Sequence, residues 1–138
     1  MIAPWAANYV GIPFKDGGRD HDGCDCWGLA RLPHVEVLGN PDMPAYSDRY
    51  VTALDKVEIA ALIRGETASN FASISRGQEQ PGDFVVFQPR AHPWHVGIVV
   101  GERKFLNVRE GDSSKVERYD SILWRSVLLG FFRLKRNP

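Results

Sequence analysis

The chain has 138 residues, and its 17 lysines and arginines balance its 17 aspartates and glutamates, so the formal net charge is zero. Without excess positive charge, nothing supports binding to nucleic acid, where neutralised phosphates supply much of the affinity. A composition of 43% hydrophobic and 25% charged residues is typical of one globular domain, spanning residues 1–138. No apolar run approaches the roughly 20 residues of a membrane-spanning helix, and no secretion signal is visible. We therefore expect synthesis in the cytoplasm and no membrane insertion.

The first third of the chain is predicted to contain two helices separated by a loop. Pro4–Val10 is predicted as a short helix, with proline in its first turn and glycine just past its end. Residues 11–23 hold four glycines and three aspartates, which predicts a loop running over the surface. A longer helix is predicted from Cys26 to Leu38, ending at Gly39, with a kink or break at Pro33.

Helical spacing of apolar residues predicts a second long helix over Ser47–Arg64. After residue 82 the spacing changes to alternation, which indicates strands, and a short helix is expected near Ser121–Arg125. The predicted strands are Asp83–Gln88, His95–Gly101, Lys104–Arg109, Lys115–Tyr119 and Leu128–Leu134. Because the helices come first, we expect an α+β fold whose N-terminal helices pack on a C-terminal antiparallel, meandering sheet.

Two cysteines, Cys24 and Cys26, stand one residue apart, too close for an ordinary disulfide. Cys26 opens the predicted helix, where unpaired N–H groups and the positive end of the helix dipole favour a thiolate. Asp25 is expected to cap the same helix. Two alternatives stay open: both cysteines are small buried apolar residues, or they bind zinc with His21 and His34, although the thiol spacing fits no ordinary zinc motif.

His95 opens a predicted strand and is the candidate base that a cysteine nucleophile requires. A three-residue turn at Gly101–Arg103 places Asn107 diagonally across from His95, within reach of the imidazole. A two-residue turn would place Asn107 on the other face of the sheet, so the arrangement depends on the register of this hairpin. We expect Gly97 to leave space beside the imidazole, and Cys26, His95 and Asn107 to form a triad.

The segments that carry a resemblance are residues 11–14, 23–29, 81–87, 95–100, 105–108 and 129–133, which are spread over nearly the whole chain. They resemble one known family, the NlpC-type cell-wall peptidases, which are small papain-like enzymes. The nucleophile segment of that family is similar to Gly11-Ile12-Pro13-Phe14 and Gly23-Cys24-Asp25-Cys26-Trp27-Gly28-Leu29. Its later strands are similar to residues 81–87, 95–100, 105–108 and 129–133. The resemblance implies a papain-like α+β fold and a cysteine peptidase that needs no metal or other cofactor.

By the same resemblance Cys26 is the nucleophile, His95 the base and Asn107 the residue that orients the imidazole, at a position where the family often has histidine. The implied substrate is the stem peptide of peptidoglycan, cut at an amide bond. Candidates for contact with this substrate are Tyr9, Asp25 and Trp94.

The Gly-Cys-Asp-Cys form of the motif resembles the branch of the family encoded with bacteriophage tails and gene-transfer particles. That branch implies tail or tail-hub proteins as partners, incorporation into a phage-like tail and action at the host cell wall. One alternative is a tail-tip or tail-assembly subunit that retains the peptidase fold with little activity. Another is a zinc-binding module.

Overall fold

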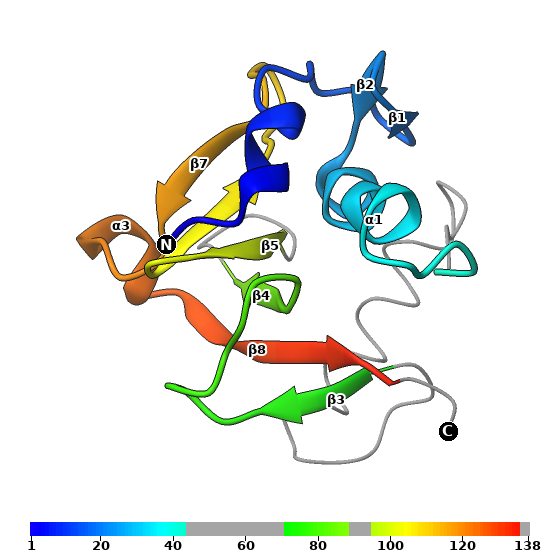
Figure 1. The fold of residues 1–138 in the computed structure, drawn as a ribbon. Coiled ribbons are helices and arrows are strands. Elements are labelled where there is room, and N and C mark those ends of the chain that lie inside the picture. Colours follow the sequence, from blue (N-terminus) through cyan, green and yellow to red (C-terminus); the bar gives the residue numbers. More distant parts are fainter. Residues whose placement is uncertain (44–70, 89–94, 136–138) are drawn as a thin grey trace.

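The computed structural model describes residues 1–43, 71–88 and 95–135. These residues form an antiparallel six-stranded sheet, a helix packed on it and a small separate hairpin (Figure 1). The sheet has the order β3-β8-β4-β5-β6-β7. Its strands are β3 (Phe71–Ile74), β4 (Phe84–Phe87), β5 (His95–Gly101), β6 (Lys104–Asn107), β7 (Lys115–Arg118) and β8 (Leu128–Leu134). The α+β class expected from the sequence is confirmed.

The strand order departs from a simple meander. Strands β4 to β7 pair in chain order, but β8 returns to pair with the free side of β4, and β3 then pairs with β8 at the edge. The alternation of the sequence predicts five of these strands to within two residues at each end, and β5 and β8 at their observed limits. It does not predict β3.

The helices are close to those expected. Pro4–Tyr9 forms a 3₁₀ helix, η1, while α1 runs from Cys26 to Glu36 and a short α3 covers Ile122–Arg125. The expected break at Pro33 is absent, since α1 continues to Glu36; Pro33 lies in the last turn, where its carbonyl accepts from the N–H groups of Val37 and Leu38. The predicted helix Ser47–Arg64 lies outside the described residues. Among the helices that are described, none has the length and apolar character needed to cross a membrane.

The glycine-rich segment was expected to be a loop running over the surface, but part of it has regular structure. It forms a hairpin of β1 (Arg19–Asp20) and β2 (Gly23–Cys24), which lies beside the beginning of α1 (Figure 1). A β-carbon on Gly28 would lie 2.0 Å from the carbonyl oxygen of Gly18, so the helix and the hairpin approach as closely as backbone allows. The absence of a side chain at Gly28 therefore lets the hairpin pack on the first turn of α1.

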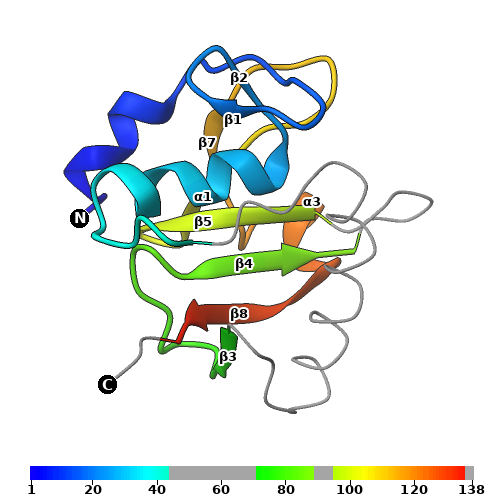
Figure 2. The ribbon, with the colours of Figure 1, turned by 90° about the vertical axis from the view of Figure 1, so that its right-hand side faces the viewer.

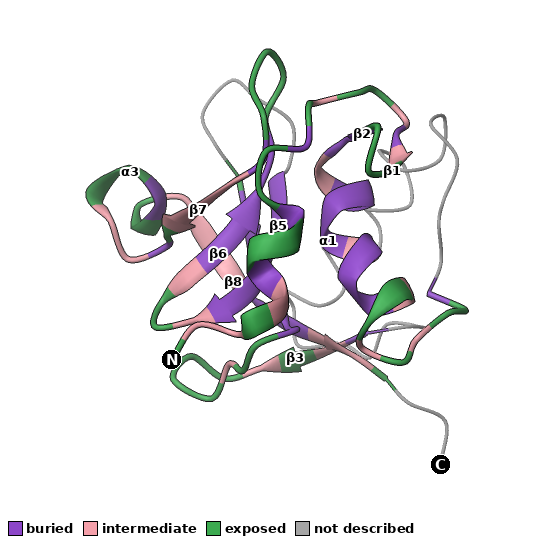
Figure 3. Cartoon of the chain, turned by 45° about the horizontal axis from the view of Figure 1, so that its top comes forward, coloured by how far each residue is buried: buried purple, intermediate pink, exposed green. Residues whose placement is uncertain are grey.

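The central strands are buried on both faces (Figure 3). Apolar burial of this extent is the main favourable term in folding. The face toward α1 contributes Phe84, Val86, Val96, Ile98, Val100 and Leu106, which pack with Trp27, Leu29, Ala30 and Leu32. The opposite face contributes Val85, Phe87, Val99 and Phe105, which pack with Tyr119, Trp124 and Phe131. Since side chains alternate along a strand, His95 faces the second group.

Helix α1 lies along β5, and the two elements begin at the same end of the molecule (Figure 2). Cys26 is the first residue of α1 and His95 is the first residue of β5. The fold thus places the starts of two distant segments at the same end of the sheet.

Candidate active site

The beginning of α1 is held by a carboxylate that accepts from two donors. Asp25 Oδ1 accepts from the backbone N–H of Gly28 at 2.7 Å, as a helix cap does, and from Arg19 Nη1 at 2.7 Å. Arg19 Nη1 also donates to the carbonyl of Gly18 at 2.8 Å. The expected cap is confirmed. Arg19 and Asp25 thus form an ion pair directly beside Cys26.

The two cysteines have different surroundings although one residue separates them. Cys24 is fully buried, and its Sγ donates to the carbonyl of Asp20 at 3.1 Å. Burial, followed by the charges of Asp25 and Asp20, raises the pKa of the Cys24 thiol to about 12. Cys26 is half-buried at the helix start. Of the two thiols, Cys26 is therefore the one suited to react with a substrate.

The turn between β5 and β6 is shorter than expected. Only two residues, Glu102 and Arg103, form it, with φ angles of 55° and 58°. A β-bulge offsets the shorter turn, since the register shifts just before Gly101, whose φ is 112°. Glycine takes this conformation without steric cost. Asn107 therefore stays on the same face of the sheet as His95.

This register brings two predicted site residues into contact. His95 Nε2 donates to Asn107 Oδ1 at 3.0 Å, and the two side chains are 8% and 1% exposed. The expected space beside Gly97 is not empty, because a β-carbon there would lie 2.5 Å from the ring of Phe105. The absence of a side chain at Gly97 thus lets Phe105 pack against β5, next to the imidazole pair.

A second layer of contacts surrounds this pair, and the sequence patterns do not predict it. Asn107 Nδ2 donates to Glu117 Oε2 at 2.9 Å and approaches the carbonyl of Lys115 at 3.4 Å. Trp124 Nε1 donates to the other carboxylate oxygen, Glu117 Oε1, at 3.3 Å. The Trp124 indole also stacks on the His95 imidazole, with ring centroids 5.2 Å apart and planes 16° from parallel. No local pattern marks Glu117 or Trp124, because their contacts with Asn107 and His95 join different elements of the fold.

The surroundings of His95 lower the pKa of its imidazole. Burial is the largest cause; the hydrogen bond to Asn107 acts in the opposite direction, the Arg109 guanidinium lowers the pKa further and the Glu117 carboxylate raises it. The imidazole is therefore neutral at neutral pH. With its proton on Nε2, donated to Asn107, the lone pair is on Nδ1, which is the state a general base requires.

The three candidates for substrate contact have different positions. Tyr9 is buried; its hydroxyl donates to Glu36 Oε1 at 2.7 Å and its ring stacks on His21 at 5.3 Å. Asp25 is also buried, in the cap and the ion pair with Arg19. Trp94 lies outside the described residues. Tyr9 and Asp25 thus hold the segments on both sides of the glycine-rich loop in place.

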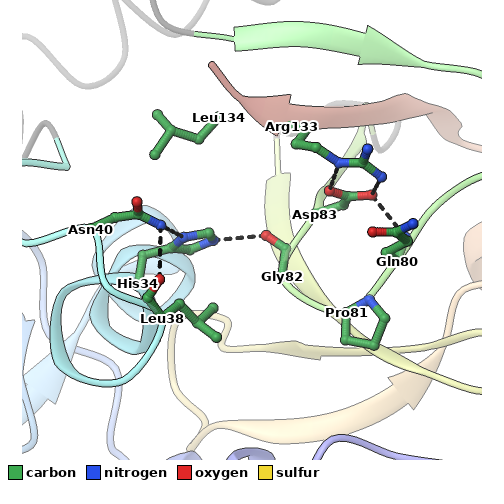
Figure 4. Close-up of a pocket in the computed structure, with 9 residues that line it drawn as sticks. All are labelled: His34, Leu38, Asn40, Gln80, Pro81, Gly82, Asp83, Arg133 and Leu134. Atoms are coloured by element: carbon green, nitrogen blue, oxygen red, sulfur yellow. Dashed lines mark hydrogen bonds and ion pairs between the residues drawn. The ribbon is translucent and has the colours of Figure 1, made fainter. Parts of the chain in front are cut away.

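The zinc alternative receives no support from the contacts of its histidines. His21 Nε2 bonds to the Glu36 carboxylate. His34, two residues before Glu36 in α1, lies beside a hollow that is also lined by residues 80–83, which precede β4, and by Arg133 and Leu134 of β8 (Figure 4). His34 Nε2 donates to the Gly82 carbonyl at 2.7 Å, and Asn40 Nδ2 donates to His34 Nδ1 at 3.0 Å. Within ranges 1–43, 71–88 and 95–135, no three histidine, cysteine or acidic side chains gather as metal ligands would.

The fold and the helix-start thiol define a papain-like domain. A profile of the NlpC/P60 family matches residues 11–133. The chain therefore belongs to the NlpC/P60 family, which comprises cysteine peptidases and peptidoglycan hydrolases. The papain-like fold expected from the sequence is confirmed by solved structures.

The chain is similar to the NlpC/p60 domain of the peptidoglycan hydrolase SagA, with 25% identity, a TM-score of 0.59, and coverage of 95% of this chain and 92% of that one. A lipoprotein-like NLP/P60 protein of Staphylococcus aureus shares the fold, at 20% identity and a TM-score of 0.63, over 96% of this chain and 39% of that one. Protein P54 of Enterococcus faecium is 26% identical over 124 residues, which are 89% of this chain. The chain spans 20% of the length of that relative.

The contrast between the two thiols predicts different reactivity. In variants that retain a single cysteine, iodoacetamide at pH 7.5 should alkylate Cys26 at least about tenfold faster than Cys24, because one unit of pKa changes the thiolate fraction about tenfold. Mass spectrometry of the intact protein over time measures both rates. Equal rates in the folded variants, with both becoming fast in urea, would show that the helix start does not distinguish Cys26.

Proposed function

We propose that this domain is a cysteine peptidase that hydrolyses an amide bond in the stem peptide of peptidoglycan. The observation that carries the proposal is the half-buried Cys26 at a capped helix start, at the same end of the molecule as the hydrogen-bonded pair of His95 and Asn107. Membership of the NlpC/P60 family supports the reaction class. The similarity to a domain described as part of a peptidoglycan hydrolase supports the substrate.

In the proposed mechanism, Cys26 Sγ attacks the carbonyl carbon of the scissile amide while His95 Nδ1 takes the thiol proton. The C–N bond then breaks, His95 returns the proton to the leaving amine, and a thioester with Cys26 remains. Water attacks the thioester, again with His95 as base, and releases the carboxylic acid and the thiol. Each step balances without a metal or a redox partner.

The negative charge that develops on the carbonyl oxygen needs hydrogen-bond donors. The first turn of α1 directs its N–H groups toward this region, and that of Gly28 is already bonded to Asp25. We assign the backbone N–H of Cys26 to this role. A fixed donor in a site with little water stabilises the oxyanion more than the same donor in bulk solvent.

Replacing the nucleophile tests the whole proposal. Cys26→Ala should lower the release of fragments from purified peptidoglycan by about a thousandfold or more, because the acyl intermediate cannot form. The melting temperature should change little, since the thiol is not part of the fully buried core. Mass analysis of the soluble fragments measures the reaction and identifies the bond. Cys24→Ala is the matched control; loss of activity there, with an active Cys26→Ala, would reassign the nucleophile.

Asn107 is expected to orient the imidazole rather than to react. Asn107→Ala should reduce turnover about 10- to 100-fold, less than His95→Ala, because nucleophile and base remain. Asn107→His should recover much of the loss, since one ring nitrogen accepts from His95 while the other donates to Glu117 as the amide does now. The measurement is the turnover of Asn107→Ala, Asn107→His and His95→Ala on the same peptidoglycan. Wild-type turnover in Asn107→Ala would remove this residue from the site.

We further propose that the domain acts within a phage-like tail and assists passage through the host cell wall. The support is the form of the nucleophile segment, in which Cys24, Asp25 and Cys26 follow Gly23. Particles purified from cells that carry the gene should contain the chain in fixed stoichiometry, measured by quantitative mass spectrometry. Particles carrying Cys26→Ala should assemble normally but digest peptidoglycan poorly. Absence of the chain from the particles would refute the association with tails.

A further inference from the structure

The Asn107 amide has two chemically different ends, and only one of its two orientations suits His95. In the structure Oδ1 faces His95 Nε2 at 3.0 Å, and Nδ2 faces Glu117 Oε2 at 2.9 Å. The reversed amide would place its oxygen against the negative carboxylate and its N–H groups against the imidazole. The carboxylate accepts only, so it discriminates between the orientations. The Lys115 carbonyl favours the same orientation, but at 3.4 Å it is the more distant acceptor.

The same carboxylate also holds the ring that covers the imidazole. Trp124 Nε1 donates to Glu117 Oε1 at 3.3 Å, and the indole stacks on His95 at 5.2 Å between centroids. Trp124 is 3% exposed, and its ring centroid lies 4.6 Å from that of Phe87. The indole is therefore also held by apolar packing. A closed set of contacts therefore runs from His95 to Asn107, to Glu117, to Trp124 and back to His95.

We propose that Glu117 is a positioning residue for the reaction: by bonding Asn107 and Trp124 at once, it fixes the amide orientation and ring stacking that hold His95 in its catalytic tautomer. This inference rests on the proposed function, because it assigns a role to a residue that touches neither the substrate nor Cys26.

The chemical consequence concerns the position of one proton. With Oδ1 toward the imidazole, neutral His95 carries its proton on Nε2 and offers the lone pair of Nδ1. If the amide reverses, Nδ2 donates to Nε2, the imidazole proton moves to Nδ1, and the lone pair needed to accept the thiol proton is lost. Glu117 thus acts on catalysis through the ring tautomer. In addition, its negative charge raises the pKa of His95, against the lowering by burial and Arg109.

The test follows the tautomer directly, without substrate. In the 138-residue chain carrying Cys26→Ala, ¹⁵N-detected NMR of labelled histidines at pH 8 reports which ring nitrogen of His95 holds the proton. We expect the Nε2–H form alone with Glu117 present, and a substantial Nδ1–H population in Glu117→Leu. Glu117→Gln keeps one acceptor oxygen, so it should lie between the two. A signal unchanged in both variants would overturn the proposal.

Kinetics in the protein with Cys26 intact provide the second measurement. On a soluble muropeptide fraction, Glu117→Leu should lower kcat about tenfold or more and leave KM unchanged, because Glu117 does not contact the substrate. Glu117→Gln should restore part of kcat. A change confined to KM would overturn the positioning role.

Glu79→Gln is the matched control for simple loss of a partly buried carboxylate. Glu79 also accepts from two donors, the Tyr119 hydroxyl at 2.7 Å and the Gly77 N–H at 2.6 Å, and neither belongs to the site. This variant should keep the His95 tautomer and kcat, even if its melting temperature falls. An equal loss of kcat in Glu79→Gln would show that the effect of the Glu117 variants comes from lower stability, and it would overturn the proposal.

The two measurements separate this inference from the proposed function. If wild-type protein releases nothing from muropeptides but the His95 tautomer depends on Glu117, the positioning role stands and the proposed substrate is wrong. If the protein is active and the tautomer does not depend on Glu117, the proposed function stands and the positioning role is wrong.

Discussion

The register of the hairpin between β5 and β6 is the constraint on which the site depends. Side chains alternate along a strand, so a shift of one residue would turn Asn107 toward the apolar core beneath α1 and leave His95 without its acceptor. The two-residue turn alone would produce that shift, and the bulge at Gly101 reverses it. Glu102 and Arg103 adopt positive φ angles at a cost of roughly 1–2 kcal/mol each. Burial of both faces of the central strands offsets this cost and leaves the hairpin a single register.

Local patterns predict the parts of the structure that depend on local chemistry. Alternation fixes the limits of β5 and β8, and the Asp25 cap follows from a short acidic side chain before a helical pattern. The pairing of β8 with both β3 and β4 is different, because it joins segments far apart in sequence. The candidate site likewise has contacts that local patterns predict and contacts that they do not. The contact of His95 with Asn107 spans one tight hairpin, whereas Glu117 reaches Asn107 only through the register of β6 and β7, which a longer loop sets.

Electrostatic balance recurs around the proposed catalytic groups. At the helix start, Arg19 and Asp25 form a largely buried ion pair, so the cap is obtained without an unpaired buried charge. Around His95, the Arg109 guanidinium and the Glu117 carboxylate act in opposite directions on the imidazole, and Arg109 also lies 5.2 Å from the Trp124 ring centroid. Burial therefore dominates the outcome. A histidine in such surroundings is neutral, and its hydrogen-bond partners decide where its proton is.

The burial of Cys24 has a consequence for the lifetime of the protein in an oxidising medium. Many thiols that react with peroxides are protected by a neighbouring cysteine, which captures the sulfenic acid as a disulfide that reductants can reverse. Cys24 is near in sequence but is held in β2 with its proton donated to the Asp20 carbonyl, and its high pKa leaves almost no thiolate to capture anything. Oxidation of Cys26 beyond the sulfenic acid is irreversible. Cys24 is thus poorly suited to act as a resolving cysteine, and the described residues offer Cys26 no internal route of repair.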